Sequence, residues 1–310
     1  MFSPFPLLRL PGVILCEVFK SLSIGEKIKL SLCSTKITTQ INNAQFYSHN
    51  VIVNQDFLSH KIRIHSENNK DVFEIFICPD IGKNHNSNTQ RCPIACCTVP
   101  VIFIPTGIKI FWKIYSEGFL SVIQHLLKVF QCKISININC YCSNLFQQTI
   151  SKLFELQLEF RTLTIKIQHL KIYNNLGLVE DLKIFSLPDP EFIPVFTSWP
   201  QKITIMNSAW FTLEYLLTCT CTRILLEDSL LGNEDLDVVL KNWKAGGFPN
   251  LEYLYIESQR ISDNGWTILG VNLLKLRGKH IKNNDRSKKL VTKLSTKFGF
   301  ERIEMSVTVV

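Results

Sequence analysis

The stretch CTRILLEDSLLGNEDLDVVLKNWKAGGFPNLEYLYI, residues 221–256, combines two hydrophobic patterns. Its two ends, Cys221–Leu226 and Leu251–Ile256, each follow the pattern apolar-x-x-apolar-x-apolar. Between them, Asn233–Ala245 has the apolar spacing of a short helix. A strand, a helix and a second strand in this order predict parallel strands that line one surface.

The six-residue pattern recurs through the second half of the chain. Its fourth positions are residues 163, 182, 203, 224, 254 and 274, separated by 19, 21, 21, 30 and 20 residues. Leucine-rich repeats have a similar L-x-x-L-x-L core with a period of about 20–29 residues. We therefore predict an irregular leucine-rich-repeat-like α/β region over residues 111–278. The alternative is an ordinary α/β domain whose buried strands happen to alternate.

The register of this repeat determines which side chains face away from the core. If its fourth and sixth positions are buried, the third and fifth positions and the residue after the sixth line an exposed strand face. Aromatic residues flanked by charge on such a face are typical of a protein-binding site, unless a neighbouring helix or the N-terminal strands cover them. The candidate substrate-binding residues are Phe185, Met206, Arg223, Leu225, Tyr253, Tyr255 and Glu257.

The N-terminal segment, residues 5–38, is rich in apolar residues but is interrupted by prolines and by Arg9. These interruptions disfavour both a cleaved signal peptide and a membrane-spanning helix. Pro11 can instead begin a helix, and Ser23 to Glu26 form a capping-box pattern that begins a second. The first helix is apolar on nearly all sides, and about 45 residues form a small core. We therefore expect its second apolar side to contact another protein.

We expect two domains, a helical module over residues 1–48 and a larger domain over residues 49–310. In the larger domain, alternating residues predict a hairpin over residues 60–78. Asn, Pro and Gly predict a surface loop over residues 79–100.

The net charge of +8 is concentrated near the C-terminus, where we predict a basic hairpin over residues 279–310. Between Lys275 and Arg302, ten basic residues oppose only Asp285 and Glu301, which accounts for the whole net charge. No Phe, Trp or Tyr lies between Lys275 and Lys297, which favours a solvated hairpin. The alternative is a segment that binds nucleic acid or an acidic partner.

The sequence contains no motif of a catalytic, cofactor-binding or metal site. A phosphate loop, a nucleophile elbow, H-E-x-x-H and G-x-G-x-x-G are all missing, and the 7 histidines have no paired-ligand spacing. The 11 cysteines lack zinc-site spacing, and N-x-[ST] sequons are missing, which favours reduced structural thiols and a cytoplasmic or nuclear location. We therefore expect no catalytic residue, no cofactor and no metal in a chain that is not an enzyme.

The N-terminal module resembles an F-box motif from Phe5 to about Asn43. It departs from many F-boxes at Val13, where an acidic residue is common. The resemblance implies binding to the Skp-type adaptor of a cullin-RING ubiquitin ligase. The residues that carry it, and that we expect to contact the adaptor, are Leu10, Pro11, Leu15, Val18, Leu22, Ile28 and Leu32.

A second resemblance covers Trp199–Ser258, which is similar to the type-2 F-box-associated domain of nematode F-box proteins. The segments that carry it, most of which contain Trp or Pro, are Trp199–Gln201, Trp210–Glu214, Asn233–Asp237, Trp243–Ala245 and Phe248–Glu252. Together the two resemblances imply a substrate-recruiting subunit of an SCF-type ubiquitin ligase. Its partners would be the Skp-type adaptor, a cullin held through the adaptor, and an unknown protein substrate, with no membrane partner.

Overall fold

The computed structural model describes residues 7–44, 51–56, 59–80, 82, 88–95, 97–139, 143–156, 158–166, 175–185, 196–263, 265–297 and 300–309. The chain forms two compact units, Met1–Glu159 and Phe160–Val310. The predicted helical module is the N-terminal part of the first unit.

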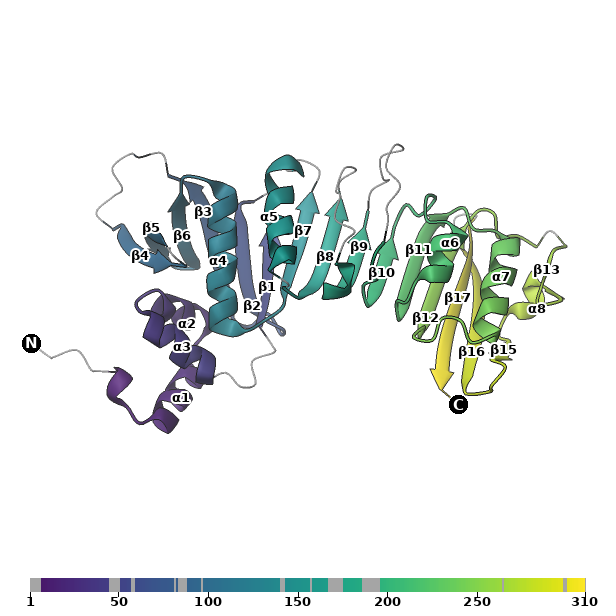
Figure 1. The fold of residues 1–310 in the computed structure, drawn as a ribbon, viewed down its shortest axis with the longest axis horizontal. Helices are drawn as coiled ribbons and strands as arrows, with labels where there is room; N and C mark the ends of the chain where they lie inside the picture. Colours follow the sequence, from purple (N-terminus) through teal and green to yellow (C-terminus); the bar gives the residue numbers. More distant parts are fainter. Residues whose placement is uncertain are drawn as a thin grey trace, which may run out of the picture. The chain divides into compact units, whose positions relative to one another are not determined.

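The first unit consists of helices and a mixed sheet (Figure 1). The helices are η1 (Leu7–Arg9), α1 (Gly12–Ser21), α2 (Ile24–Ser31), α3 (Thr35–Ala44), α4 (Tyr115–Phe130) and α5 (Ser143–Glu155). The strands are β1 (Val51–Asp56), β2 (Lys61–Ser66), β3 (Val72–Pro79), β4 (Gln90–Ile94), β5 (Cys97–Ile104), β6 (Gly107–Trp112) and β7 (Ile134–Asn139). Within this unit the strands lie in the order β7-β1-β2-β3-β6-β5-β4.

Local sequence explains most of these elements. The capping box of α2 is formed, because the Ser23 backbone N–H donates to Glu26 Oε2 at 2.8 Å and the Glu26 N–H donates to Ser23 Oγ at 3.2 Å. The strands β2 and β3 pair antiparallel where the sequence predicts a hairpin. Helix α4 buries Phe119, Ile123 and Leu126 on the face that it turns toward the sheet.

The predicted loop over residues 79–100 is wrong for its second half. Strands β4 and β5 form an antiparallel hairpin there, and Cys92, Ile94 and Val99 are buried. The prolines and polar residues of this segment obscured an alternating pattern of small apolar residues. Pro93 is compatible with a strand because β4 lies at the edge of the sheet, where proline is tolerated.

The second unit contains the predicted parallel strands. The helices are η3 (Leu176–Leu178), α6 (Leu213–Thr218), α7 (Asn233–Lys244) and α8 (Leu273–Leu276). The strands are β8 (Phe160–Lys166), β9 (Val179–Ile184), β10 (Lys202–Ile205), β11 (Arg223–Ser229), β12 (Tyr253–Ser258), β13 (Thr267–Ile268), β14 (Val271–Asn272), β15 (His280–Lys282), β16 (Lys288–Lys297) and β17 (Phe300–Val309). Strands β8 to β12 are parallel neighbours in chain order, and β17, β16 and β15 continue the sheet beyond β12 as antiparallel strands.

The fourth positions of the six-residue pattern form one row across the parallel strands. Each of them pairs with the next strand's fourth position, and all of them are fully buried. The sixth positions form a second buried row in the same way. The fourth-position row consists of Leu163, Leu182, Ile203, Ile224 and Leu254. The predicted register is therefore confirmed for these strands, and Figure 1 shows α6 and α7 over one face of them.

The last predicted repeat, at residues 271–276, is wrong. Leu274, its fourth position, is 62% exposed, and the segment forms β14 followed by the short helix α8. The Asn272 side chain accepts a hydrogen bond from the Lys275 N–H at 3.2 Å and so begins the helix. Leu273 and Leu276 are buried, and their spacing of three residues is that of a helix. The six-residue strand pattern matched this segment only because most of its residues are apolar.

The basic C-terminal segment forms the predicted hairpin, but it is part of the sheet. Strand β17 pairs with β12 from Tyr253 to Ser258 and with β16 along its length. Leu290, Ile303 and Met305 are fully buried between these strands and the helices. The expectation of a solvated terminal hairpin is therefore wrong for one of its faces.

Candidate interaction surfaces

The helical module buries part of its own apolar surface. Leu15, Ile28 and Leu32, three of the residues predicted to contact an adaptor, are 5%, 1% and 3% exposed. Phe19 in α1 and Ile41 in α3 are completely buried beside them. The prediction that these three leucine and isoleucine side chains are presented to a partner is corrected, because they belong to the core of the first unit.

The exposed apolar side chains of the module lie at its N-terminal end. Pro11 is exposed, and Leu10, Val18 and Leu22 are half-buried, so these four predicted positions remain accessible. Sequence reasoning did not list three exposed residues as contacts, although the first helix, apolar on nearly all sides, was a signal for Val13 and Ile14. The exposed residues that we call the N-terminal apolar patch are Leu8 at 43%, Val13 at 79% and Ile14 at 50% exposure.

Helices α2 and α3 pack against the rest of the first unit. The Ile24 N–H donates to Asp71 Oδ2 at 2.6 Å, and Asn42 Nδ2 donates to the Lys128 carbonyl oxygen at 2.6 Å. A Cβ added to Gly25 would lie 2.6 Å from the Phe73 ring, so α2 approaches β3 closely. Helix α4 and the sheet of the same unit therefore cover α2 and α3. The expectation that another protein contacts the second apolar side of the first helix stays a prediction, because Val13 and Ile14 of α1 are exposed.

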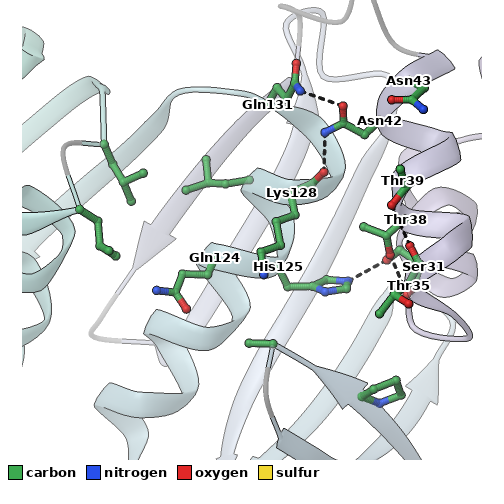
Figure 2. Close-up of a pocket in the computed structure, with 15 residues that line it drawn as sticks. Ser31, Thr35, Thr38, Thr39, Asn42, Asn43, Gln124, His125, Lys128 and Gln131 are labelled. Atoms are coloured by element: carbon green, nitrogen blue, oxygen red, sulfur yellow. Dashed lines mark hydrogen bonds between the residues drawn. The ribbon is translucent and has the colours of Figure 1, made fainter.

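A buried histidine of α4 contacts α2, and so links the helical module to the rest of the first unit. His125 of α4 is 8% exposed, and its Nε2 lies 2.8 Å from Ser31 Oγ of α2 (Figure 2). Because the Ser31 hydroxyl donates to the Ile28 carbonyl oxygen, it accepts from His125, which fixes the neutral Nε2–H tautomer. Burial, and then the nearby charge of Lys128, lower the pKa of His125 from 6.5 to about 4.

A cavity of about 840 Å³ opens beside this histidine, between α3 and α4. Figure 2 shows polar side chains of both helices around it, and the Gln131 side chain donates to Asn42 Oδ1 at 2.8 Å. This cavity could not be predicted from the sequence, because its wall combines residues about ninety positions apart in the chain.

The exposed strand face of the second unit has the predicted orientation. Third and fifth positions of β10, β11 and β12 are exposed or half-buried, whereas the fourth and sixth are buried. Four predicted substrate-binding residues lie together here, because Arg223 pairs with Tyr253 and Leu225 pairs with Tyr255 in register. The Arg223 guanidinium lies 5.1 Å from the centre of the Tyr253 ring.

The other three predicted residues differ in their surroundings. Phe185 is 38% exposed, with Lys166 Nζ 5.3 Å from its ring centre, and Met206 is half-buried one strand further along. Glu257 is only 9% exposed and forms an ion pair with Arg302 Nη2 at 2.6 Å. It is therefore held within the fold rather than offered to a substrate.

The residue that sequence reasoning missed on this face is Arg302 of β17. It lies opposite Glu257, and the Tyr255 hydroxyl donates to the same carboxylate at 2.7 Å. Burial and the hydrogen bond to Glu257 raise the pKa of Tyr255 above its ordinary value. Arg302 and Glu257 are 45 positions apart, so only the antiparallel pairing of β12 with β17 brings them together.

The described residues give no metal site, and the thiols of two buried cysteines are held protonated. No group of three or more His, Cys, Asp or Glu side chains among them could hold a metal ion. Burial raises the pKa of the Cys132 thiol to about 12, and a hydrogen bond with Cys219, together with burial, raises the pKa of Cys221. These thiols are poor nucleophiles for that reason. Among the helices that the structure describes, none has the length and apolar composition that a bilayer crossing requires.

Two protein families match separate regions of the chain, one in each unit. The F-box domain family matches residues 7–49, and the F-box associated family matches residues 195–256. An uncharacterized protein of Caenorhabditis elegans is 21% identical over 258 residues, which cover 78% of this chain and 58% of the relative. The match thus spans little more than half the length of that relative, and no solved structure matches the chain. These matches place an F-box domain in the first unit and an F-box associated domain in the second, in the order expected along the chain.

Proposed function

We propose that this chain is the substrate-recruiting subunit of an SCF-type cullin-RING ubiquitin ligase. The observation that carries the proposal is the combination, in one chain, of an F-box domain and an F-box-associated domain. In this role the chain has no catalytic step of its own. It raises the rate of ubiquitin transfer by holding a substrate lysine close to a conjugating enzyme on another subunit, in the cytoplasm or nucleus.

The Skp-type adaptor docks on the N-terminal apolar patch in this proposal. Leu8, Val13 and Ile14 expose apolar surface at the start of the module, and Leu10, Pro11, Val18 and Leu22 adjoin them in sequence. Exposed apolar side chains grouped in this way are typical of protein interfaces. Leu15, Ile28 and Leu32 support the surface from beneath.

The substrate docks on the exposed strand face, where the chain has its leucine-rich-repeat-like register. Support for this description comes from the shared rows of Leu163 to Leu254 and from the helices α6 and α7 between successive strands. The face combines aromatic, aliphatic and charged side chains, as protein-binding sites do.

The alternative function, binding of nucleic acid or an acidic partner by the basic C-terminal segment, rests on its exposed lysines and arginines. Two of its cations form ion pairs within the chain: Lys293 pairs with Glu304, and Arg302 pairs with Glu257. This pairing reduces the field that the segment presents to a polyanion, and we favour the ligase role.

The test is capture of a purified Skp-type adaptor by the full-length chain. We expect the wild type to bind and the Leu8→Asp/Ile14→Asp variant to lose about tenfold or more in affinity, because a charge would enter an apolar interface. The matched control is Leu274→Asp/Val309→Asp, which places the same charges on two exposed apolar residues of the second unit. Point variants are preferable to removal of residues 1–48, because that truncation would uncover α4. An adaptor that ignores the wild-type chain contradicts the proposed function.

A further inference from the structure

Two cations lie side by side at the start of the exposed strand face. Lys202 of β10 and Arg223 of β11 are paired in register, so their backbones are separated by about 4.8 Å. Both side chains are exposed, and neither forms an ion pair with a carboxylate in the part of the chain that the structure describes. Asp181 of β9 is paired in register with Lys202 on its other side, but its carboxylate forms an ion pair with Lys183 at 3.3 Å.

Three other cations on this face are neutralised within the chain. Each of the three has a carboxylate on its own strand or on a neighbouring strand. The ion pairs are Lys183–Asp181 at 3.3 Å, Lys293–Glu304 at 3.3 Å and Arg302–Glu257 at 2.6 Å. The excess positive charge of β10 to β12 is therefore concentrated at Lys202 and Arg223.

Apolar and aromatic groups lie next to this charge. Tyr253 stacks under Arg223, and Leu225 and Tyr255 form the next row of the same face, both half-buried. The stacked ring restricts the guanidinium, so less conformational entropy is lost when an anion binds it.

From this arrangement we infer that the substrate presents an acidic peptide segment, with its carboxylates at Lys202 and Arg223 and an aliphatic or aromatic side chain against Leu225 and Tyr255. The inference rests on the proposed function and names the substrate class that it requires. A peptide fits the site better than a nucleic acid, because one short charged row adjoins an apolar row. A polyanion needs a longer basic track, with ring faces free to stack bases, whereas the ring of Tyr253 is already covered by Arg223.

The test is selection of short random peptides on the purified full-length chain bound to its adaptor, followed by measurement of the selected peptides by fluorescence anisotropy. We expect the selected peptides to be enriched in Asp and Glu beside an aliphatic or aromatic residue. Their affinity should fall as salt increases, and it should fall about tenfold or more in Lys202→Thr/Arg223→Thr. Threonine keeps the β propensity of both positions.

The matched control is Arg91→Thr/Lys109→Thr, which removes one exposed arginine and one exposed lysine from strands of the first unit. It should bind the selected peptides as the wild type does. Peptides without acidic enrichment, or equal loss in both double variants, would overturn the inference. Equal binding of a mixed-sequence RNA would also overturn it, in favour of general anion binding. Adaptor binding is measured on the same proteins, so a failed peptide selection with intact adaptor binding refutes only the substrate class.

Discussion

Replacing His125 by glutamine should remove a specific part of the acid sensitivity of the first unit. The imidazole is held neutral between α2 and α4, where it donates to Ser31. Glutamine also offers an amide N–H to Ser31 Oγ, but it does not titrate. The comparison between the two proteins therefore isolates the protonation of one side chain.

The magnitude follows from the shift in pKa. The folded-state pKa of His125 is about 4, below its ordinary value of 6.5. Because the folded value is the lower one, the unfolded chain binds more protons between these limits, and stability rises with pH through this window. At about 1.4 kcal/mol per pKa unit, the wild type loses about 2 kcal/mol by about pH 5 and about 3 kcal/mol below pH 4, relative to neutral pH.

The assay is urea unfolding near pH 7 and near pH 5, with the amides of α4 followed by hydrogen exchange so that the signal belongs to the first unit. We expect the stability of the wild type to fall more between these two conditions than that of His125→Gln, by about 2 kcal/mol. The variant His280→Gln, which removes an exposed histidine, is the control and should follow the wild type. If wild type and His125→Gln lose stability in parallel, the reasoning about a neutral buried imidazole is refuted.

Two further predictions test the second unit. Leu254→Ala should lower the free energy of unfolding by about 2–5 kcal/mol in denaturant unfolding, because it leaves a cavity in the buried row. Leu274→Ala should change it by no more than about 0.5 kcal/mol, because that side chain is exposed. Equal losses would mean that Leu274 is buried as the six-residue pattern predicts. Glu257→Gln should lower the free energy of unfolding by about 2 kcal/mol, because it leaves the half-buried Arg302 without its carboxylate. The loss should be smaller when Glu257→Gln is made in the Arg302→Met variant. Additive losses in this double-mutant cycle would show that the two side chains are not coupled.

The parallel strands were predictable because each strand buries alternate residues, and the same six-residue pattern marks the buried ones. That pattern placed Leu163, Leu182 and Ile203 in one row without any knowledge of the fold. It failed at Leu274, where four apolar residues in six are equally compatible with a short helix. Local patterns of this length do not distinguish the two structures when a capping residue such as Asn272 is present.

The contacts within the helical module and around the strand face were not predictable in the same way. The pairs Ser31–His125 and Glu257–Arg302 join residues that no local period relates. The apolar excess of α1 to α3 correctly indicated a missing neighbour, but it could not say whether that neighbour was another protein or a later part of the same chain. The three-dimensional fold is needed to identify the neighbour.

The packing of α2 and α3 on α4 and β3 also bears on how freely the F-box can be exchanged. A helical module that touched only its adaptor could be replaced by the module of another protein, with no change elsewhere. Here Gly25 must stay small to admit Phe73, and Ser31 must accept from His125, so a chimaera would need matching residues on both sides of this junction. Substitutions at these positions are therefore expected to be inherited in pairs.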